Sequence, residues 1–125
     1  MKRDMDLIRE ILLFLEANNE FNEEKRVNPN DFSNDNVGIL SSHFRLIKDA
    51  KYIQDLTIGS GGYIVTGAIT NQGYDFIESV RNPDIWRKTK AAGDKVGGWT
   101  VSLLAEYAKG LLKLQFDNLL NGGAS

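Results

Sequence analysis

Apolar side chains recur at steps of three and four residues near both ends of the chain, the spacing that lines one face of an α-helix. The first helical pattern runs from about Asp4 to Asn18, with Asp4 and Asp6 placed to favour the positive end of the helix dipole. The last begins near Thr100 and reaches about Leu120. Because apolar residues cover most of its circumference, we expect this last helix to pack on more than one side.

A third helical pattern occupies residues 35–51, and either Ser33 or Asp35 can cap its start. Four apolar side chains fall on one face of this helix, namely Val37, Leu40, Phe44 and Ile47. The opposite face carries polar and charged side chains, Ser41, Ser42, Arg45, Lys48 and Asp49. We expect that second face to be exposed to solvent.

Alternating apolar and polar residues, many of them β-branched, replace the helical spacing at residues 52–58 and again at residues 63–69. The run Gly59-Ser60-Gly61-Gly62 between them is a turn sequence, so the two segments predict a β-hairpin. A glycine-rich run can also bind phosphate, but phosphate loops lead into a helix and this run leads into a strand.

The segment between the first two helices, residues 20–34, is polar and acidic. We expect an ordered loop there, with a short strand near Val27. A helix-turn-helix motif needs a first helix in this segment, and Pro29 leaves little room for one.

Two further helices are predicted after the hairpin. Thr70 can cap a helix that reaches Val80, in which Gly73 allows a neighbouring segment to approach closely. Pro83 suits the first turn of a second, short helix. Three glycines predict a break after it, Gly93, Gly97 and Gly98.

The order of these elements predicts an α+β, mostly helical fold: a winged helix-turn-helix-like domain with a β-hairpin wing and a C-terminal helical extension. A chain of 125 residues is long enough for one domain with one core. We therefore predict a single domain over residues 1–125, with a winged-helix-like core at about 4–80 and the extension at about 83–120.

Composition excludes several kinds of chemistry. There is no cysteine, so disulfides, thiolate metal sites and cysteine nucleophiles are absent. His43 is the single histidine and has no acid near it in sequence at the spacing of a catalytic triad or a metal site. We expect an exposed polar histidine, no metal, no cofactor, no small-molecule ligand and no enzymatic activity. Without a targeting or membrane-spanning segment, the cytoplasm is the expected compartment.

Charge is unevenly distributed along the chain. The formal net charge is -2, but residues 1–35 carry five Lys and Arg against nine Asp and Glu, whereas residues 36–98 carry eight against six. The weakly basic part coincides with the middle helix, whose side chains could contact base edges and phosphates of double-stranded DNA. The candidate DNA-binding residues are Ser42, His43, Arg45, Lys48 and Lys51. An alternative basic surface is formed by Arg87, Lys88 and Lys90.

A protein-interaction role is the second hypothesis, and it is favoured by the apolar last helix and the acidic first third of the chain. The candidate oligomerisation residues are Leu104, Tyr107, Leu111 and Leu114. The same leucines could instead close the core of a monomer. We expect a homodimer or a protein partner. A homodimer would be compatible with both hypotheses, because winged-helix proteins that bind DNA often pair through terminal helices.

Several short segments resemble one known family. They are the opening MKRDMDLIR at residues 1–9, HFRLIKDA at 43–50, TNQGYDF at 70–76 and DIW at 84–86. They resemble the small bacterial and phage proteins catalogued as domain of unknown function 2513. That family brings no established activity, so the resemblance implies a bacterial, phage or prophage origin.

The middle of the chain also resembles winged-helix transcription regulators, in which a helix ending in a Leu-x-x-Ala-Gly-Leu-Ile type of sequence precedes the wing. Residues 47–53 fill that place, with Lys51 where such families usually have glycine. Together the two resemblances imply a small phage- or prophage-associated protein with a DNA-binding or transcription-regulatory role.

Overall fold

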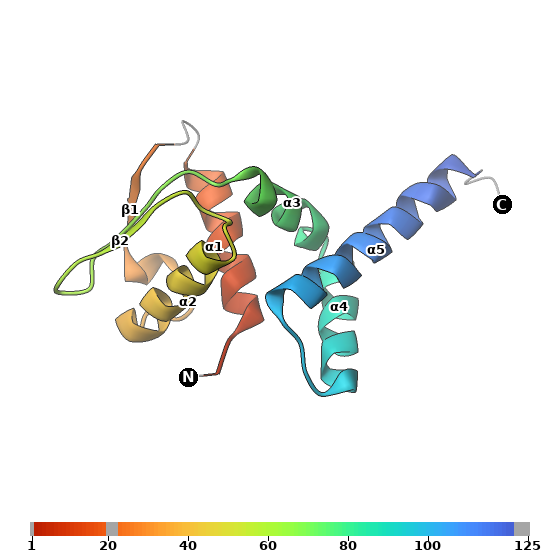
Figure 1. Cartoon of the computed structure of the whole chain (residues 1–125), viewed down its shortest axis with the longest axis horizontal. Helices are drawn as coiled ribbons and strands as arrows, with labels where there is room; N and C mark the ends of the chain where they lie inside the picture. The colour runs from red at the N-terminus through yellow and green to blue at the C-terminus, as the bar shows by residue number, and fades with distance from the viewer. Residues whose placement is uncertain (1, 20–22, 122–125) are drawn as a thin grey trace. The chain divides into compact units, whose positions relative to one another are not determined.

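The computed structural model describes residues 2–19 and 23–121. The chain divides into two compact units, Met1–Ile77 and Glu78–Ser125, and the division falls near the end of the predicted core. Among the described residues the fold is α+β and mostly helical, with five α-helices and one small antiparallel sheet (Figure 1). The predicted fold class is confirmed at this level.

The first unit contains most of the element types of the chain. In order they are α1 (Met5–Asn18), β1 (Lys25–Val27), the 3-10 turn η1 (Pro29–Asp31), α2 (Val37–Asp49), β2 (Leu56–Ile58), β3 (Ile64–Thr66) and the greater part of α3 (Asn71–Val80). The predicted first and middle helices, the short strand near Val27 and the helix after Thr70 are therefore all present.

The sheet has the strand order β1-β3-β2, with both pairings antiparallel. The hairpin sets Ile58 opposite Ile64, and β1 adds to the outer side of β3 with Arg26 opposite Val65. The strands are shorter than the alternating segments, although an isolated bridge joins Ile53 and Ile69 near the other end of the hairpin. The predicted hairpin is confirmed.

The segment before α2 contains no α-helix within its described residues, 23–34. Pro29 begins η1, and Asn28 caps this turn by accepting a hydrogen bond from the Asn30 N–H. Asp31 accepts a hydrogen bond from the Asn28 N–H in return, so the two residues form a capping box. A single 3-10 turn therefore stands where the first helix of a helix-turn-helix would lie, as the proline suggested.

The core of the first unit lies between α1, α2 and the sheet. α1 buries one broad apolar face, with Met5, Leu7, Ile8, Ile11, Leu12 and Leu15. Phe32, which follows η1, packs edge-on against Phe14 of α1 and Phe44 of α2, with ring centroids 4.9 and 6.0 Å apart. This aromatic chain fixes the loop before α2 to both helices, so the start of α2 is held in place.

The N-cap of α2 is Asn36, and the expectation of Ser33 or Asp35 is wrong. The Asn36 side chain accepts a hydrogen bond from the Ile39 N–H at 3.0 Å. Ser33 is engaged elsewhere, because its N–H and hydroxyl both donate to the carboxylate of Glu10 in α1. The helix therefore begins at Val37, beyond both of the expected caps.

The end of α2 is a left-handed turn centred on Lys51, whose φ is 65°. The Lys51 N–H donates to the Lys48 carbonyl and the Tyr52 N–H donates to the Ile47 carbonyl, the hydrogen-bond pattern of a Schellman motif. A lysine thus takes here a left-handed position that glycine usually occupies. Because Cβ disfavours this conformation, Lys51 carries local backbone strain.

Replacement of Lys51 by glycine is expected to raise the free energy of unfolding by about 0.5–1 kcal/mol, because glycine adopts positive φ without the Cβ penalty. Urea denaturation followed by circular dichroism measures the change. Lys48→Gly, which places glycine inside the last turn of the same helix, serves as the control and should destabilise the protein by up to about 1 kcal/mol. If Lys51→Gly instead lowered the free energy of unfolding, the inference of backbone strain at residue 51 would be wrong.

The second unit is built from α4 (Pro83–Val96) and α5 (Val101–Leu120), which pack against each other. Asn82 caps α4 by accepting from the N–H groups of Asp84 and Ile85. α4 runs through Gly93 and ends at Gly97, whose φ is 73°, so the expected break at Gly93 is wrong. None of the helices in the described part of the chain has the length and apolar character needed to span a membrane.

Candidate nucleic-acid interface

The solvent side of α2 carries the predicted DNA-binding cations. Arg45 and Lys51 are exposed and Lys48 is half-buried, while Asp49 lies exposed among them. Ser42 is half-buried, and its hydroxyl donates to the Gly38 carbonyl of the preceding turn at 2.9 Å. The structure therefore brings three of the predicted cations to one helix and its C-terminal turn.

His43 does not belong to this surface, and its predicted exposure is wrong. Its side chain is completely buried. Its Nε2 accepts from the Asp4 N–H at 2.9 Å, and its Nδ1 lies 2.7 Å from the Ile39 carbonyl oxygen. These contacts require a neutral ring with the proton on Nδ1. His43 is thus a structural link between α2 and the start of α1, out of reach of a ligand at the α2 surface.

Ser41 is also buried, contrary to the expected solvent-facing side of α2. The buried surface of α2 is wider than its apolar stripe, because Ser41 and His43 flank Leu40 and Phe44 on both sides. Small or hydrogen-bonded polar side chains can take such positions. The exposed face that remains is correspondingly narrow.

Arg26 of β1 is a further cation, outside the predicted DNA-binding residues. It is exposed, and its guanidinium carbon lies 5.1 Å from the centroid of the Tyr63 ring at the hairpin tip. Residues 59–62 contain no lysine or arginine, so the hairpin tip itself offers no cation to a phosphate. The pairing of β1 with β3 places Arg26 beside the tip, since a residue diagonally across two paired strands lies within reach of a long side chain.

A shallow groove joins the hairpin tip to the start of α2. Its volume is about 440 Å³, and it is lined by Arg26, Val27, Asn28, Pro29, Val37, Gly61, Gly62 and Tyr63. Gly62 has a φ of 84°, and a Cβ added there would lie 2.4 Å from Cγ1 of Val37. The tip can approach the first turn of α2 this closely because residue 62 is a glycine.

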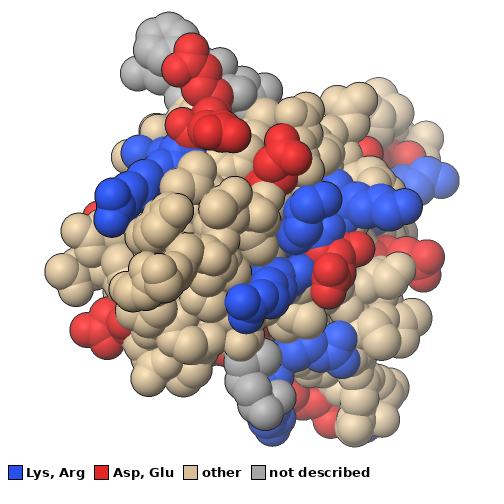
Figure 2. All heavy atoms as spheres, turned by 60° about the vertical axis from the view of Figure 1, so that its left-hand side comes forward, with Lys and Arg blue, Asp and Glu red and all other residues tan. Residues whose placement is uncertain are grey.

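The electrostatic character of the molecular surface is mixed. On the face shown in Figure 2, Lys and Arg side chains are interspersed with Asp and Glu side chains rather than gathered into one positive band. Residues 42–51 alone carry three cations and one carboxylate. A negatively charged ligand that binds at α2 would therefore be attracted by nearby cations at short range and not by a long-range field of the whole protein.

The alternative basic surface lies on α4 in the second unit. Arg87 forms an ion pair with Asp84 at 3.2 Å, and both side chains are more than 70% exposed. Lys88 is exposed and Lys90 is half-buried. Because the Arg87 charge is partly balanced by a neighbour in its own helix, this surface offers less net charge than its sequence suggested.

Within residues 2–19 and 23–121, no three or more His, Asp and Glu side chains lie together so that they could hold a metal ion. Behind the α2 turn, burial raises the pKa of Tyr52 above its ordinary value, and its ring stacks on Phe76 at 4.9 Å. Tyr52 is therefore a neutral packing residue.

Comparison with known proteins identifies relatives of this chain. The model of a family described as hypothetical protein (DUF2513) matches residues 2–99, which include α1 to α4 and end before α5. An uncharacterized protein of Haemophilus influenzae is 32% identical over 92 residues, which cover 72% of this chain and 76% of that protein. No solved structure matches the chain.

Proposed function

The chain belongs to the DUF2513 family of hypothetical proteins, and on that premise we propose that it is a small DNA-binding regulator, of the kind that phages and prophages carry. In this proposal the first unit is a winged-helix domain. Its recognition helix is α2, and its wing is the hairpin of β2 and β3.

The observation that carries this proposal is the connectivity of the first unit. A helix and a short strand precede α2, a hairpin follows it, and β3 pairs with both β1 and β2. A winged-helix domain orders its elements in the same way, with η1 here in the place of the second helix. Fold alone does not determine function, so the charges on α2 and β1 form the second part of the proposal.

Arg45 and Lys48 are proposed to contact base edges or phosphates in the major groove, with Ser42 and Lys51 beside them. Arg26 is proposed to contact the phosphate backbone next to the wing. Because the proposed surface carries few cations and the protein has a formal net charge of -2, binding should rest on a small number of phosphate contacts. Its salt slope should then be modest, about one for each contact.

The alternative function is a protein-interaction module without DNA binding. It is supported by the second unit, where seven exposed large apolar side chains lie on α5: Leu103, Tyr107, Leu112, Leu114, Phe116, Leu119 and Leu120. Exposed apolar residues at this density are typical of binding surfaces.

Fluorescence anisotropy of the protein with a pool of labelled duplexes, including its own upstream region, tests the DNA-binding proposal. The double variant Arg45→Ala/Lys48→Ala is expected to weaken binding by roughly tenfold or more. It should also reduce the salt slope by about two, because each of the two cations would neutralise one DNA phosphate.

The matched control is Lys88→Ala/Lys90→Ala, which removes the same charge from α4 and should leave affinity and slope unchanged if binding uses α2. If Lys88→Ala/Lys90→Ala weakened binding and Arg45→Ala/Lys48→Ala did not, the DNA-binding surface would lie on α4. Absence of binding to every duplex at low salt would overturn the DNA-binding proposal and leave the protein-interaction alternative.

A further inference from the structure

One face of α5 is apolar, exposed and regular. Leu103, Tyr107, Gly110 and Leu114 follow one another at steps of four, three and four residues, the heptad spacing of helices that pair along their length. These four residues, here called the 103–114 face, lie within an arc of about 60° on the helix. Leu103, Tyr107 and Leu114 are 57%, 46% and 58% exposed.

The described residues of the chain give no reason for a glycine at position 110. It lies inside α5, where glycine costs about 1 kcal/mol relative to alanine. Within residues 2–19 and 23–121, a Cβ added at Gly110 would have no atom within 4 Å apart from its own helix backbone and neighbours. In the middle of an exposed apolar face, a missing side chain makes a hollow that a large side chain from outside can fill.

We propose that the 103–114 face binds the same face of a second copy of this chain, with the two α5 helices antiparallel. In the register centred between residues 108 and 109, Tyr107 lies opposite the partner's Gly110, and Leu103 lies opposite the partner's Leu114. Each large side chain then meets a hollow or another apolar side chain. A parallel pair would set Tyr107 against the partner's Tyr107 and leave both hollows at Gly110 facing each other.

The charged residues beside the 103–114 face also favour the antiparallel orientation. Glu106 and Lys113 lie on one flank of the face, about 20° apart around the helix. In the antiparallel register, Glu106 and the partner's Lys113 stand about 3 Å apart along the axis, so two equivalent ion pairs form across a two-fold interface. A parallel pair would instead put the Glu106 and Lys113 flanks of the two helices on opposite sides of the interface, so that neither ion pair could form.

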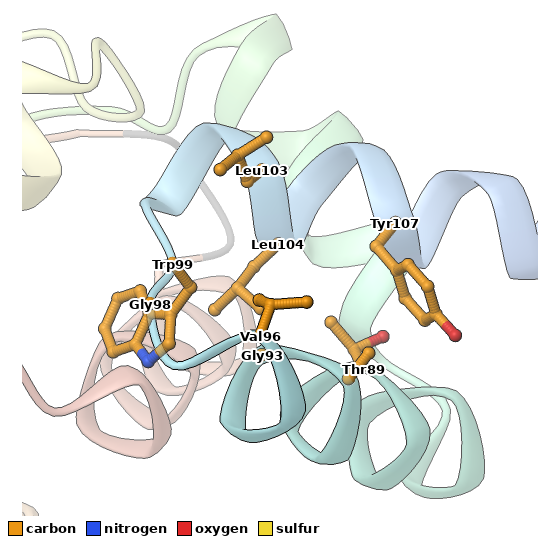
Figure 3. A pocket seen from close by; sticks show the side chains of 9 residues that line it. Thr89, Gly93, Val96, Gly98, Trp99, Leu103, Leu104 and Tyr107 are labelled. Atoms are coloured by element: carbon orange, nitrogen blue, oxygen red, sulfur yellow. The ribbon is translucent and has the colours of Figure 1, made fainter.

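An open apolar cavity lies at one end of the 103–114 face. Its volume is about 210 Å³, and its lining includes Leu103, Leu104 and Tyr107 of α5 with Gly93 and Val96 of α4 and Trp99 between the helices (Figure 3). Because Leu103 is part of this lining, the partner's Leu114 would come to rest at the cavity. Covering the cavity removes further apolar surface from water.

This inference goes beyond the proposed DNA binding and is tested without DNA. Sedimentation velocity of the full chain over a concentration series is expected to show a monomer–dimer equilibrium. At concentrations where both proteins are monomeric, Gly110→Gln should be at least as thermally stable as the unaltered protein, because glutamine is a better helix former and its side chain has open space in the monomer. It should nevertheless weaken dimerisation at least tenfold, since the side chain occupies the place of the partner's Tyr107.

The matched control is Leu119→Gln, an exposed position about 180° around the helix from Gly110, which should leave the dimer unchanged. A monomer at every concentration would overturn the proposal, as would a dimer that Gly110→Gln leaves intact. A dimer broken by Leu119→Gln would assign the interface to the other side of α5 and overturn the proposed face.

Charge reversal tests the antiparallel register. Glu106→Lys and Lys113→Glu should each weaken the dimer several-fold, and the double variant should restore it, because the two ion pairs re-form with reversed sign. A double variant weaker than either single variant would exclude this pairing of Glu106 with the partner's Lys113.

Discussion

Replacement of Gly73 by alanine is expected to lower the free energy of unfolding by about 3 kcal/mol or more. An added Cβ would lie 2.3 Å from the Tyr52 carbonyl oxygen and 2.7 Å from Cγ2 of Ile69. The nearest atom is backbone, and the same carbonyl accepts the Thr70 N–H at 3.0 Å, so it cannot move away without breaking the entry to α3. Thermal and urea denaturation followed by circular dichroism measure the loss.

Gly38→Ala is the control within the same unit. Gly38 lies in the first turn of α2, and its added Cβ would be 3.3 Å from Oδ1 of Asn36, the side chain that caps the helix. A change within about 1 kcal/mol is expected, because a small side-chain adjustment accommodates the methyl group and alanine favours the helix. If Gly73→Ala were as mild as Gly38→Ala, α3 would not approach Tyr52 as closely as the structure shows.

The elements that sequence predicted well are those determined by local chemistry. Thr70 caps α3 by accepting from the Gly73 N–H at 3.0 Å, and Thr100 caps α5 through the Leu103 N–H at 3.1 Å. The hairpin follows from alternation and from glycines with positive φ at residues 61 and 62. In each case the stabilising groups lie within a few residues of one another, so their spacing along the chain is sufficient to predict them.

The candidate site was predicted less completely because its geometry depends on pairs that are distant in sequence. Arg26 reaches the hairpin tip only because β1 pairs with β3, nearly forty residues further along the chain. Asn36 caps α2 and the predicted Ser33 does not, because Ser33 is hydrogen-bonded to Glu10 of α1. Lys51 keeps the left-handed turn against its own preference because the hydrogen bonds around it hold the backbone there.

The apolar last helix is a second case in which the pattern along the chain is not sufficient to predict the contacts. Its start and end were predicted, and Leu104 is buried as part of the second unit. Tyr107 and Leu114 remain exposed in this chain, and Leu111 is half-buried. Their role in oligomerisation stays a prediction, because helical periodicity identifies an apolar face and does not identify the molecule that covers it.

His43→Ala is expected to lower the free energy of unfolding by about 2–4 kcal/mol, although the sequence pattern predicts an exposed histidine at this position. The substitution removes a completely buried ring and leaves the Asp4 N–H without the acceptor that it has in Nε2. That N–H belongs to the N-cap of α1, so the loss acts on the start of α1 as well as on the packing of α2. Urea denaturation followed by circular dichroism gives the change.

Two further substitutions separate the cavity from the hydrogen bond. His43→Leu fills much of the volume without an acceptor, whereas His43→Gln can place Oε1 where Nε2 accepts from the Asp4 N–H. We expect both variants to be more stable than His43→Ala and less stable than the unaltered protein. A His43→Ala variant of unchanged stability that loses DNA binding would instead return His43 to the α2 surface, and the buried link between α1 and α2 would have to be abandoned.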